Sequence, residues 1–139
     1  METIDIQADV LGSITYKNLH LTHYSNGILF VDPSGDGELL LEDSEHYFAK
    51  IKELVGDNRV LILSDLTEYY FRVPKEAREE LANNSYIKSI RVADAIVVKS
   101  VPNRLLVNFY IKYCKPKEPT KIFNSMEKAK EWLLSFDLE

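Results

Sequence analysis

Residues Arg59–Asp65 have the sequence RVLILSD, and this stretch decides the class of fold that the chain predicts. Its four consecutive apolar residues, 60–63, are too few for a helix of their own and fit a strand that is buried on both faces. A second run of this kind, Ala93–Val98, follows later in the chain. Open α/β sheets usually place their sites at the carboxyl ends of such strands, which is where Ser64 and Asp65 lie. The stretch therefore predicts an α/β fold with a candidate site at that edge.

The residues before this strand predict a hairpin and a helix. The segments 15–23 and 28–31 have strand patterns, and Asn26-Gly27 between them favours a type I′ turn. Residues 38–41 either form a short edge strand or lead into the helix that follows. Apolar residues at helical spacing predict that helix over 44–55, with Asp43 or Ser44 as its N-cap and Gly56 at its end.

The residues after the strand predict three further helices. Pro74 suits the first position of a helix that runs to about residue 82. Another helix begins near Pro102, and a short strand at 121–123 precedes a final helix with Asn124 and Glu127 as its capping pair. The inward residues expected are Val101, Leu105, Phe109 and Tyr113 in the former helix, and Met126, Ala129, Leu133 and Phe136 in the latter. The whole chain thus predicts a single α/β domain, 1–139, with a mixed sheet of four to six strands and about four helices.

Composition limits the classes of function. With a 45% hydrophobic content and 139 residues, the chain can bury a core without metal or disulfide support. Its formal charge of −5 disfavours binding to nucleic acid or to an anionic membrane. The single cysteine, Cys114, cannot form an internal disulfide, and no apolar stretch approaches the roughly 20 residues that span a bilayer. We see no secretory signal, so a cytoplasmic location is expected.

Several short strings resemble the SpoIIAA-like members of the STAS superfamily, small bacterial α/β proteins, and most closely an uncharacterised branch of that group. They are Leu63-Ser64-Asp65, Glu76-Ala77-Arg78, Ala93–Ser100 leading into Asn103-Arg104, Asn108-Phe109, Lys115-Pro116-Lys117, Pro119–Phe123 and Ala129–Leu133. The resemblance implies a STAS-like fold. In the anti-sigma antagonists of the superfamily a serine in an Asp-Ser-Ser-Gly string is phosphorylated and switches partner binding. Here Asp65 is followed by Leu66-Thr67-Glu68, so the resemblance does not carry the phospho-switch over to this chain. Other relatives are tied to lipid-binding folds.

The candidate site residues gather after the strand that ends at Asp65. Asp65 and Arg78 can face one crevice and bind a small polar ligand or a charged group of a partner. Alternatively, they form a structural ion pair, or Asp65 fixes its own loop by accepting backbone N–H bonds. Tyr69, Tyr70 and Phe71 either form an exposed partner-binding patch or cover the end of the sheet. Near the start of a later helix, Asn103, Arg104 and Asn108 can bind an anion or serve as caps and solvated surface.

Metal and nucleophile chemistry find little support in the sequence. Asp32, Ser34 and Asp36 imitate the start of a calcium loop, but a strand ending in Pro33 stands where a helix is needed, so a turn-rich connection is expected. His20 and His23 would point to opposite faces of a strand. Neighbouring lysines could lower the pKa of Cys114. No nucleophile elbow, phosphate loop or dinucleotide fingerprint occurs, so we expect neither a cofactor nor enzymatic activity.

Two functions follow as hypotheses. The first is a non-catalytic regulatory or protein-binding module that uses the carboxyl edge of the sheet, alone or as a homodimer. The second is a carrier of a small apolar, lipid-like molecule held between helix and sheet, which requires an internal cavity.

Overall fold

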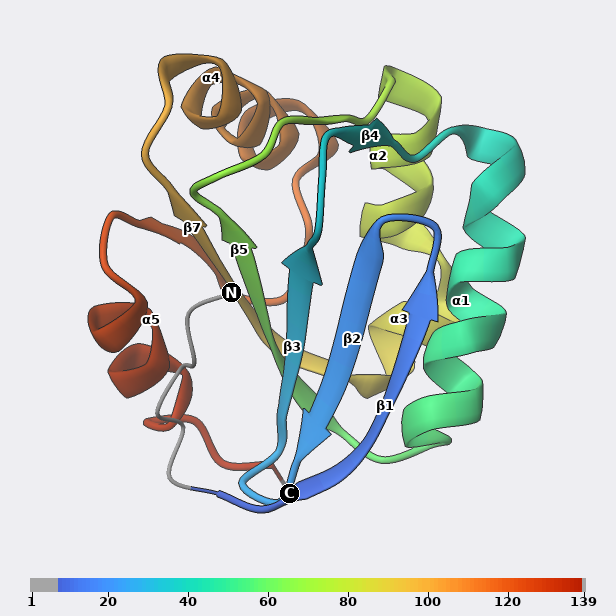
Figure 1. The fold of residues 1–139 in the computed structure, drawn as a ribbon, viewed down its shortest axis with the longest axis vertical. Coiled ribbons are helices and arrows are strands. Elements are labelled where there is room, and N and C mark those ends of the chain that lie inside the picture. Colours follow the sequence, from blue (N-terminus) through green and yellow to red (C-terminus); the bar gives the residue numbers. More distant parts are fainter. Residues whose placement is uncertain (1–7, 139) are drawn as a thin grey trace.

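The computed structural model describes residues 8–138, except for the side chains of residues 106 and 113. Strands and helices alternate after an N-terminal antiparallel region (Figure 1). The strands are β1 (Val10–Tyr16), β2 (Leu19–Tyr24), β3 (Ile28–Pro33), β4 (Gly37–Glu38), β5 (Val60–Leu66), β6 (Phe71–Arg72), β7 (Arg91–Val98) and β8 (Thr120–Phe123). The helices are α1 (Leu41–Val55), α2 (Lys75–Asn83), α3 (Ser85–Ile90), α4 (Val101–Phe109), which continues into the π-helix η1 (Tyr110–Cys114), and α5 (Met126–Leu133).

Six strands form one mixed sheet in the order β1-β2-β3-β5-β7-β8. The first three are antiparallel neighbours, and β3, β5, β7 and β8 run parallel. The two apolar runs of the sequence are therefore adjacent parallel strands, with Leu63 beside Ala95. This confirms the predicted mixed α/β sheet and places the ends of β3, β5 and β7 at one edge. A separate two-stranded sheet pairs β4 with β6 close to that edge.

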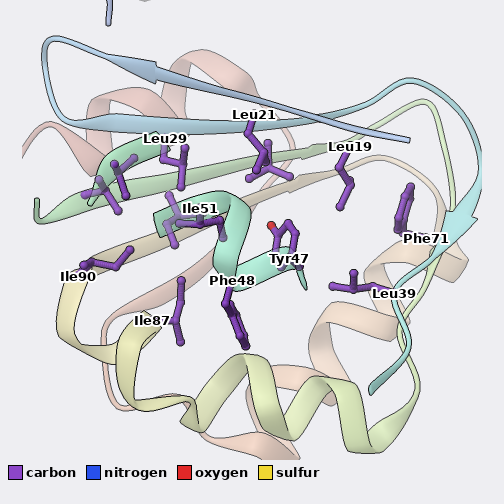
Figure 2. Close-up of a cluster of buried hydrophobic side chains, with 14 residues drawn as sticks. Leu19, Leu21, Leu29, Leu39, Tyr47, Phe48, Ile51, Phe71, Ile87 and Ile90 are labelled. Carbon is purple, nitrogen blue, oxygen red and sulfur yellow. The ribbon is translucent and has the colours of Figure 1, made fainter. Parts of the chain in front are cut away.

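The sheet separates two hydrophobic layers. On one face, Leu21, Leu29 and Ile62 pack against α1 and α3 through Phe48, Ile51 and Ile87 (Figure 2). On the other face, α5 packs Ala129 and Leu133 onto Leu61, Leu63 and Ala95. Alternation along β5 therefore decides which residues face which layer: even-numbered side chains face α1, and odd-numbered ones face α5.

The N-terminal hairpin differs from its prediction. Segment 15–23 is not one strand, because a turn at Lys17, with φ +50°, divides it into the ends of β1 and β2. The turn between β2 and β3 is not type I′, since Gly27 has φ +92° but Asn26 does not have a positive φ. Instead the Gly27 N–H donates to the Tyr24 carbonyl at 3.0 Å, and the Asn26 side chain accepts from the Ile28 N–H. Only glycine takes the left-handed position without strain.

The helix starts also differ. Helix α1 begins at Leu41, three residues before the predicted start, and Asp43 accepts a hydrogen bond from the Leu40 N–H instead of serving as the N-cap. For α5 the N-cap is Ser125, which accepts from the Lys128 N–H. The short helix α3, capped by Asn84, was not predicted.

Helix α4 presents a different face from the one predicted. Val101, Leu105 and Phe109 are exposed by 68%, 53% and 49%, whereas Asn103, Val107 and Tyr110 are buried. Three of the four residues predicted to point inward thus form an outward apolar stripe, while the side chain of the fourth, Tyr113, lies outside the described part of the chain. Helix α4 lies next to the carboxyl edge of the sheet (Figure 1).

Candidate ligand cavity

A cavity of about 160 Å³ lies between the sheet and the helices that cover its α1 face. Its walls are mostly apolar and come from β2, β3, β5, β7, α1, α2, α3, α4 and η1. Figure 2 labels several of the side chains that line it: Leu19, Leu29, Leu39, Tyr47, Ile51, Phe71 and Ile87. The polar residues among its walls are Ser64, Arg78, Arg91 and Asp94, together with Tyr47 and Tyr110. The cavity is therefore an apolar space with a few polar groups, which is the composition of many small-molecule sites.

Asp94 is the carboxylate inside this cavity. It lies in the middle of β7, between Ile62 of β5 and Thr120 of β8, and its residue is 8% exposed. Burial raises the pKa of Asp94 to about 6, while the nearby Arg91 guanidinium opposes that rise. Among the residues that the structure describes, no group donates a hydrogen bond to its Oδ1.

Arg91 is held by other groups. It is 2% exposed and forms an ion pair with Glu118, with Nη2 2.7 Å from Oε1. Its two terminal nitrogens also donate to the carbonyls of Leu81 and Ala82, at 3.0 and 3.1 Å. Arg91 therefore fixes the end of α2 and the approach to β8 against β7. These contacts satisfy much of the guanidinium.

Arg78 reaches the cavity from α2. Its Nη1 donates to the Val73 carbonyl at 2.8 Å, and its buried Nε has no hydrogen-bond acceptor among the described residues. The same side chain borders a second groove, together with Lys75, Glu79, Phe109 and Cys114. Arg78 thus lies at the boundary between the cavity and the outer surface of α2 and α4.

Asp65 and Arg78 do not share a crevice. Asp65 continues the odd-numbered face of β5 with Leu61 and Leu63, which pack under α5, whereas Arg78 lines the cavity on the opposite face. The Asp65 carboxylate accepts hydrogen bonds from the N–H and the hydroxyl of Thr67, at 3.0 and 2.6 Å. This is the structural alternative for Asp65, in which it fixes its own loop.

In the aromatic loop and at the start of α4, some of the candidate residues are buried and others are exposed. Phe71 is buried in the core, while Tyr70 is 42% exposed and Tyr69 is half-buried. The Asn103 side chain is 2% exposed and donates to the carbonyls of Leu66 and Tyr69, at 2.7 and 3.0 Å. It therefore anchors the loop. Arg104 and Asn108 are both exposed on α4.

The calcium-like segment has a structural use. The Asp36 carboxylate accepts from the Tyr70 N–H at 2.8 Å, and the Ser34 hydroxyl donates to the Asn18 carbonyl. The pKa of Asp32 is raised by burial and by neighbouring Asp65. In the described range no three His, Cys, Asp or Glu side chains are grouped to hold a metal. The segment forms the connection between β3 and the β4–β6 pair.

The remaining titratable candidates, His20, His23 and Cys114, do not form a common site. His20 contacts the Thr15 hydroxyl through Nδ1 at 3.1 Å, while His23 is buried on the other face of β2. Burial raises the pKa of the Cys114 thiol, with the Arg78 guanidinium acting against it. The suggestion that nearby lysines lower this pKa was therefore wrong, because loss of solvent outweighs the surrounding positive charge.

Sequence reasoning missed the main polar residues of the cavity: Tyr47, Arg91, Asp94 and Tyr110. One signal was present in the sequence, namely a charged residue in the middle of the apolar strand RVADAIVV. A charged side chain is rarely buried unless it is paired or functional, so a charge within this apolar strand indicates a polar site at Asp94.

The layered sheet, its N-terminal antiparallel strands and its parallel second half define this chain as an α/β protein with a SpoIIAA-like fold. A similar solved structure is an uncharacterised protein of the DUF3478 family from Shewanella loihica PV-4, described as having a SpoIIAA-like fold. The two are 17% identical, with a TM-score of 0.54, and the match covers 90% of this chain and 92% of the other. Residues 22–137 match the family model named Domain of unknown function (DUF7793), and the chain belongs to that family.

Two further findings are negative, one from the comparison with curated proteins and one from the helices of the structure. No curated protein matches the sequence significantly. Among the described residues, none of the helices has the length and apolar content needed to cross a bilayer.

Proposed function

We propose that this chain is a non-catalytic binding domain that holds a small, largely apolar molecule in the cavity between its sheet and α1, α2 and α4. The observation that carries this proposal is the cavity itself, which has a volume of about 160 Å³ and mostly apolar walls. Native cores leave few voids larger than a water molecule, and an apolar cavity of about 150 Å³ in another protein binds benzene. A compact molecule with a single ring is therefore the size class that fits.

The chemistry around the cavity supports binding more than catalysis. Arg91 is occupied by Glu118 and by two backbone carbonyls. The pKa of the Cys114 thiol is raised, and this residue borders the outer groove rather than the cavity. We find no nucleophile with an adjacent base among the described cavity residues, which is the arrangement that covalent catalysis requires.

Toluene binding followed by methyl NMR tests this proposal. We expect toluene to shift the methyl signals of Leu29, Ile51 and Ile62, which line the cavity, more than those of Leu61 and Leu63 under α5. Native mass spectrometry of gently purified protein provides a second test, because a bound cellular molecule would add its mass.

A matched pair of variants on α4 provides the control. Val107→Phe places a larger side chain into the cavity and should abolish toluene binding, whereas Val101→Phe adds the same bulk to an exposed position and should leave binding unchanged. Toluene shifts spread evenly over the protein, or equal binding by both variants, would contradict the proposal.

A second candidate function is binding to a protein partner, and the outward face of α4 favours it. Val101, Leu105 and Phe109 form an exposed apolar stripe next to the carboxyl edge of the sheet. Residues 99–117 contain five basic residues and no acidic one, although the whole chain has a net charge of −5. An apolar stripe with cationic neighbours suits an acidic amphipathic partner or, if it pairs with an acidic region of a second copy, a homodimer.

Leu105→Glu tests this second function because it places a charge in the middle of the stripe. We expect it to remove partners that wild-type protein retains from native lysate, whereas Leu134→Glu, at an exposed position just after α5, should retain them. Light scattering on the same proteins measures whether the 16.0 kDa chain is a monomer or a dimer. Identical partner sets and identical masses for all three proteins would argue against this surface.

A further inference from the structure

One carboxylate in the cavity wall has an oxygen without a hydrogen-bond donor among the described residues. Asp94 Oδ1 is buried and receives no hydrogen bond from the residues that the structure describes. Its residue is 8% exposed and lines the cavity from the middle of β7. A buried acceptor without a donor is costly, and nearly all such atoms in native proteins are paired with protein, water or ligand. A ligand that occupies this part of the cavity is therefore favoured if it can donate a hydrogen bond to the Asp94 carboxylate.

The charges around Asp94 limit which head groups a ligand can carry. Arg91 and Glu118 form an ion pair, so the Asp94 carboxylate adds one uncompensated negative charge to this group. Tyr47 and Tyr110 line the same cavity, and the charge of Asp94 adds to the effect of burial in raising the pKa of each phenol. An anionic head group would meet repulsion from this carboxylate inside a region of low dielectric constant.

We infer that the molecule held in the cavity carries a neutral hydrogen-bond donor, a hydroxyl or an amino group, which the Asp94 carboxylate accepts while the apolar walls bind the rest of the molecule. This inference rests on the proposed ligand-binding function and adds to it the class of ligand. Arg78 provides the competing anchor, because its unpaired Nε would select an acceptor or an anion instead. The two anchors therefore predict opposite preferences.

Four probes of similar shape distinguish these preferences: toluene, p-cresol, p-toluidine and 4-methylbenzoate. We expect wild-type protein at pH 7.5 to bind p-cresol or p-toluidine about tenfold more tightly than toluene, as a hydrogen bond to a charged acceptor allows. The comparison between these two probes shows whether hydroxyl or amine is preferred. Since p-cresol and p-toluidine are better hydrated than toluene, tighter binding requires a specific contact. We expect 4-methylbenzoate to bind more weakly than toluene.

Three variants assign the preference to one residue. Asp94→Leu removes the acceptor and should reduce the preference for p-cresol over toluene to about twofold or less, with toluene still bound. Asp94→Asn keeps a neutral acceptor of the same shape and should retain only part of the preference, so it tests the inference even if the leucine variant does not fold. Ser64→Ala removes another polar group of the cavity wall and should leave the preference unchanged.

Each remaining outcome counts against the inference. Tightest binding of 4-methylbenzoate would assign the anchor to Arg78, and a preference for p-cresol that persists in both Asp94 variants would place the donor contact elsewhere. Equal binding of all four probes by wild-type protein would overturn the head-group inference and leave the proposed cavity function intact. Failure of every probe to bind would overturn the proposed function itself.

Discussion

Neutralising Asp94 should stabilise the protein at neutral pH, and the change should depend on pH in a defined way. In an unfolded chain this carboxyl has a pKa near 3.8, whereas burial raises it to about 6 in the folded protein. A difference of one pKa unit corresponds to about 1.4 kcal/mol, so ionising Asp94 at high pH costs the folded state about 3 kcal/mol. Asp94→Asn has nearly the same shape and avoids that cost.

The direction follows from proton binding. Between pH 3.8 and about 6 the folded protein holds the Asp94 proton more tightly than the unfolded chain does. The contribution of this proton to stability is therefore present at low pH and is lost as the pH rises through the folded pKa. The advantage of Asp94→Asn over wild type should increase from pH 4.5 to pH 7.5 by about 2 kcal/mol and then remain constant.

Urea denaturation of both proteins at pH 4.5, 6 and 7.5 measures this difference directly. Asp57→Asn is the matched control, because Asp57 is exposed and its neutralisation removes no buried charge. The groups that interact electrostatically with Asp94, namely Arg91, Glu118, Tyr47 and Tyr110, are common to wild type and variant. A difference between wild type and Asp94→Asn that stays flat or decreases with rising pH would refute the reasoning that Asp94 ionises at a cost in the cavity.

Two further predictions concern the residues that fix the cavity walls. Asn103→Ala should lower the free energy of unfolding by about 2 kcal/mol, because the Asn103 amide nitrogen donates two hydrogen bonds to the loop after β5. As a control, Asn108→Ala at an exposed position should change the free energy of unfolding by less than about 0.5 kcal/mol. Thermal or urea unfolding measures both, and equal effects would show that the loop does not depend on Asn103. Arg91→Ala should destabilise the folded protein by about 3–5 kcal/mol, because it leaves the buried partners of Arg91 unpaired. Arg72→Ala breaks an exposed ion pair with Glu38 and should destabilise the folded protein by at most about 1 kcal/mol. Similar losses in the two arginine variants, measured by urea unfolding, would contradict the structural role assigned to Arg91.

The central sheet could be predicted because its strands carry a local signal. Apolar runs of the length seen in β5 and β7 suit a strand covered on both faces, and the structure places them side by side and parallel. The buried face of α5 was predictable for a similar reason, since Ala129 and Leu133 recur at helical spacing and both are fully buried. Most of β1 was not predicted, because it lies at the sheet edge and its first residues, Val10-Leu11-Gly12, break the alternation that the later residues of the strand show.

Helix α4 shows why a pattern of apolar residues does not always identify the buried face. The sequence offers two faces, one with Val101, Leu105 and Phe109 and the other with Val107 and Tyr110. Spacing alone favours the first, but Asn103 lies on the second and finds two backbone carbonyls beneath it. Turning the helix the other way would expose these carbonyls or leave them unpaired, so hydrogen bonding to a distant loop decides the orientation. No local pattern contains that information.

Asp94 is the converse case, in which tertiary structure makes a polar residue of an apolar strand the central group of the cavity. In the sequence it lowers the strand character of residues 91–98, and hydrophobic periodicity treats it as an interruption. In the structure the neighbouring strands, α1, η1 and the Arg91–Glu118 pair surround it, and the resulting loss of solvent is what changes its pKa. An apolar residue at this position would cost less to bury, so folding alone gives no reason for a carboxylate there. The carboxylate is better explained by a role inside the cavity, and this is the physical argument for regarding the cavity, rather than the Asp65 edge, as the working part of the molecule.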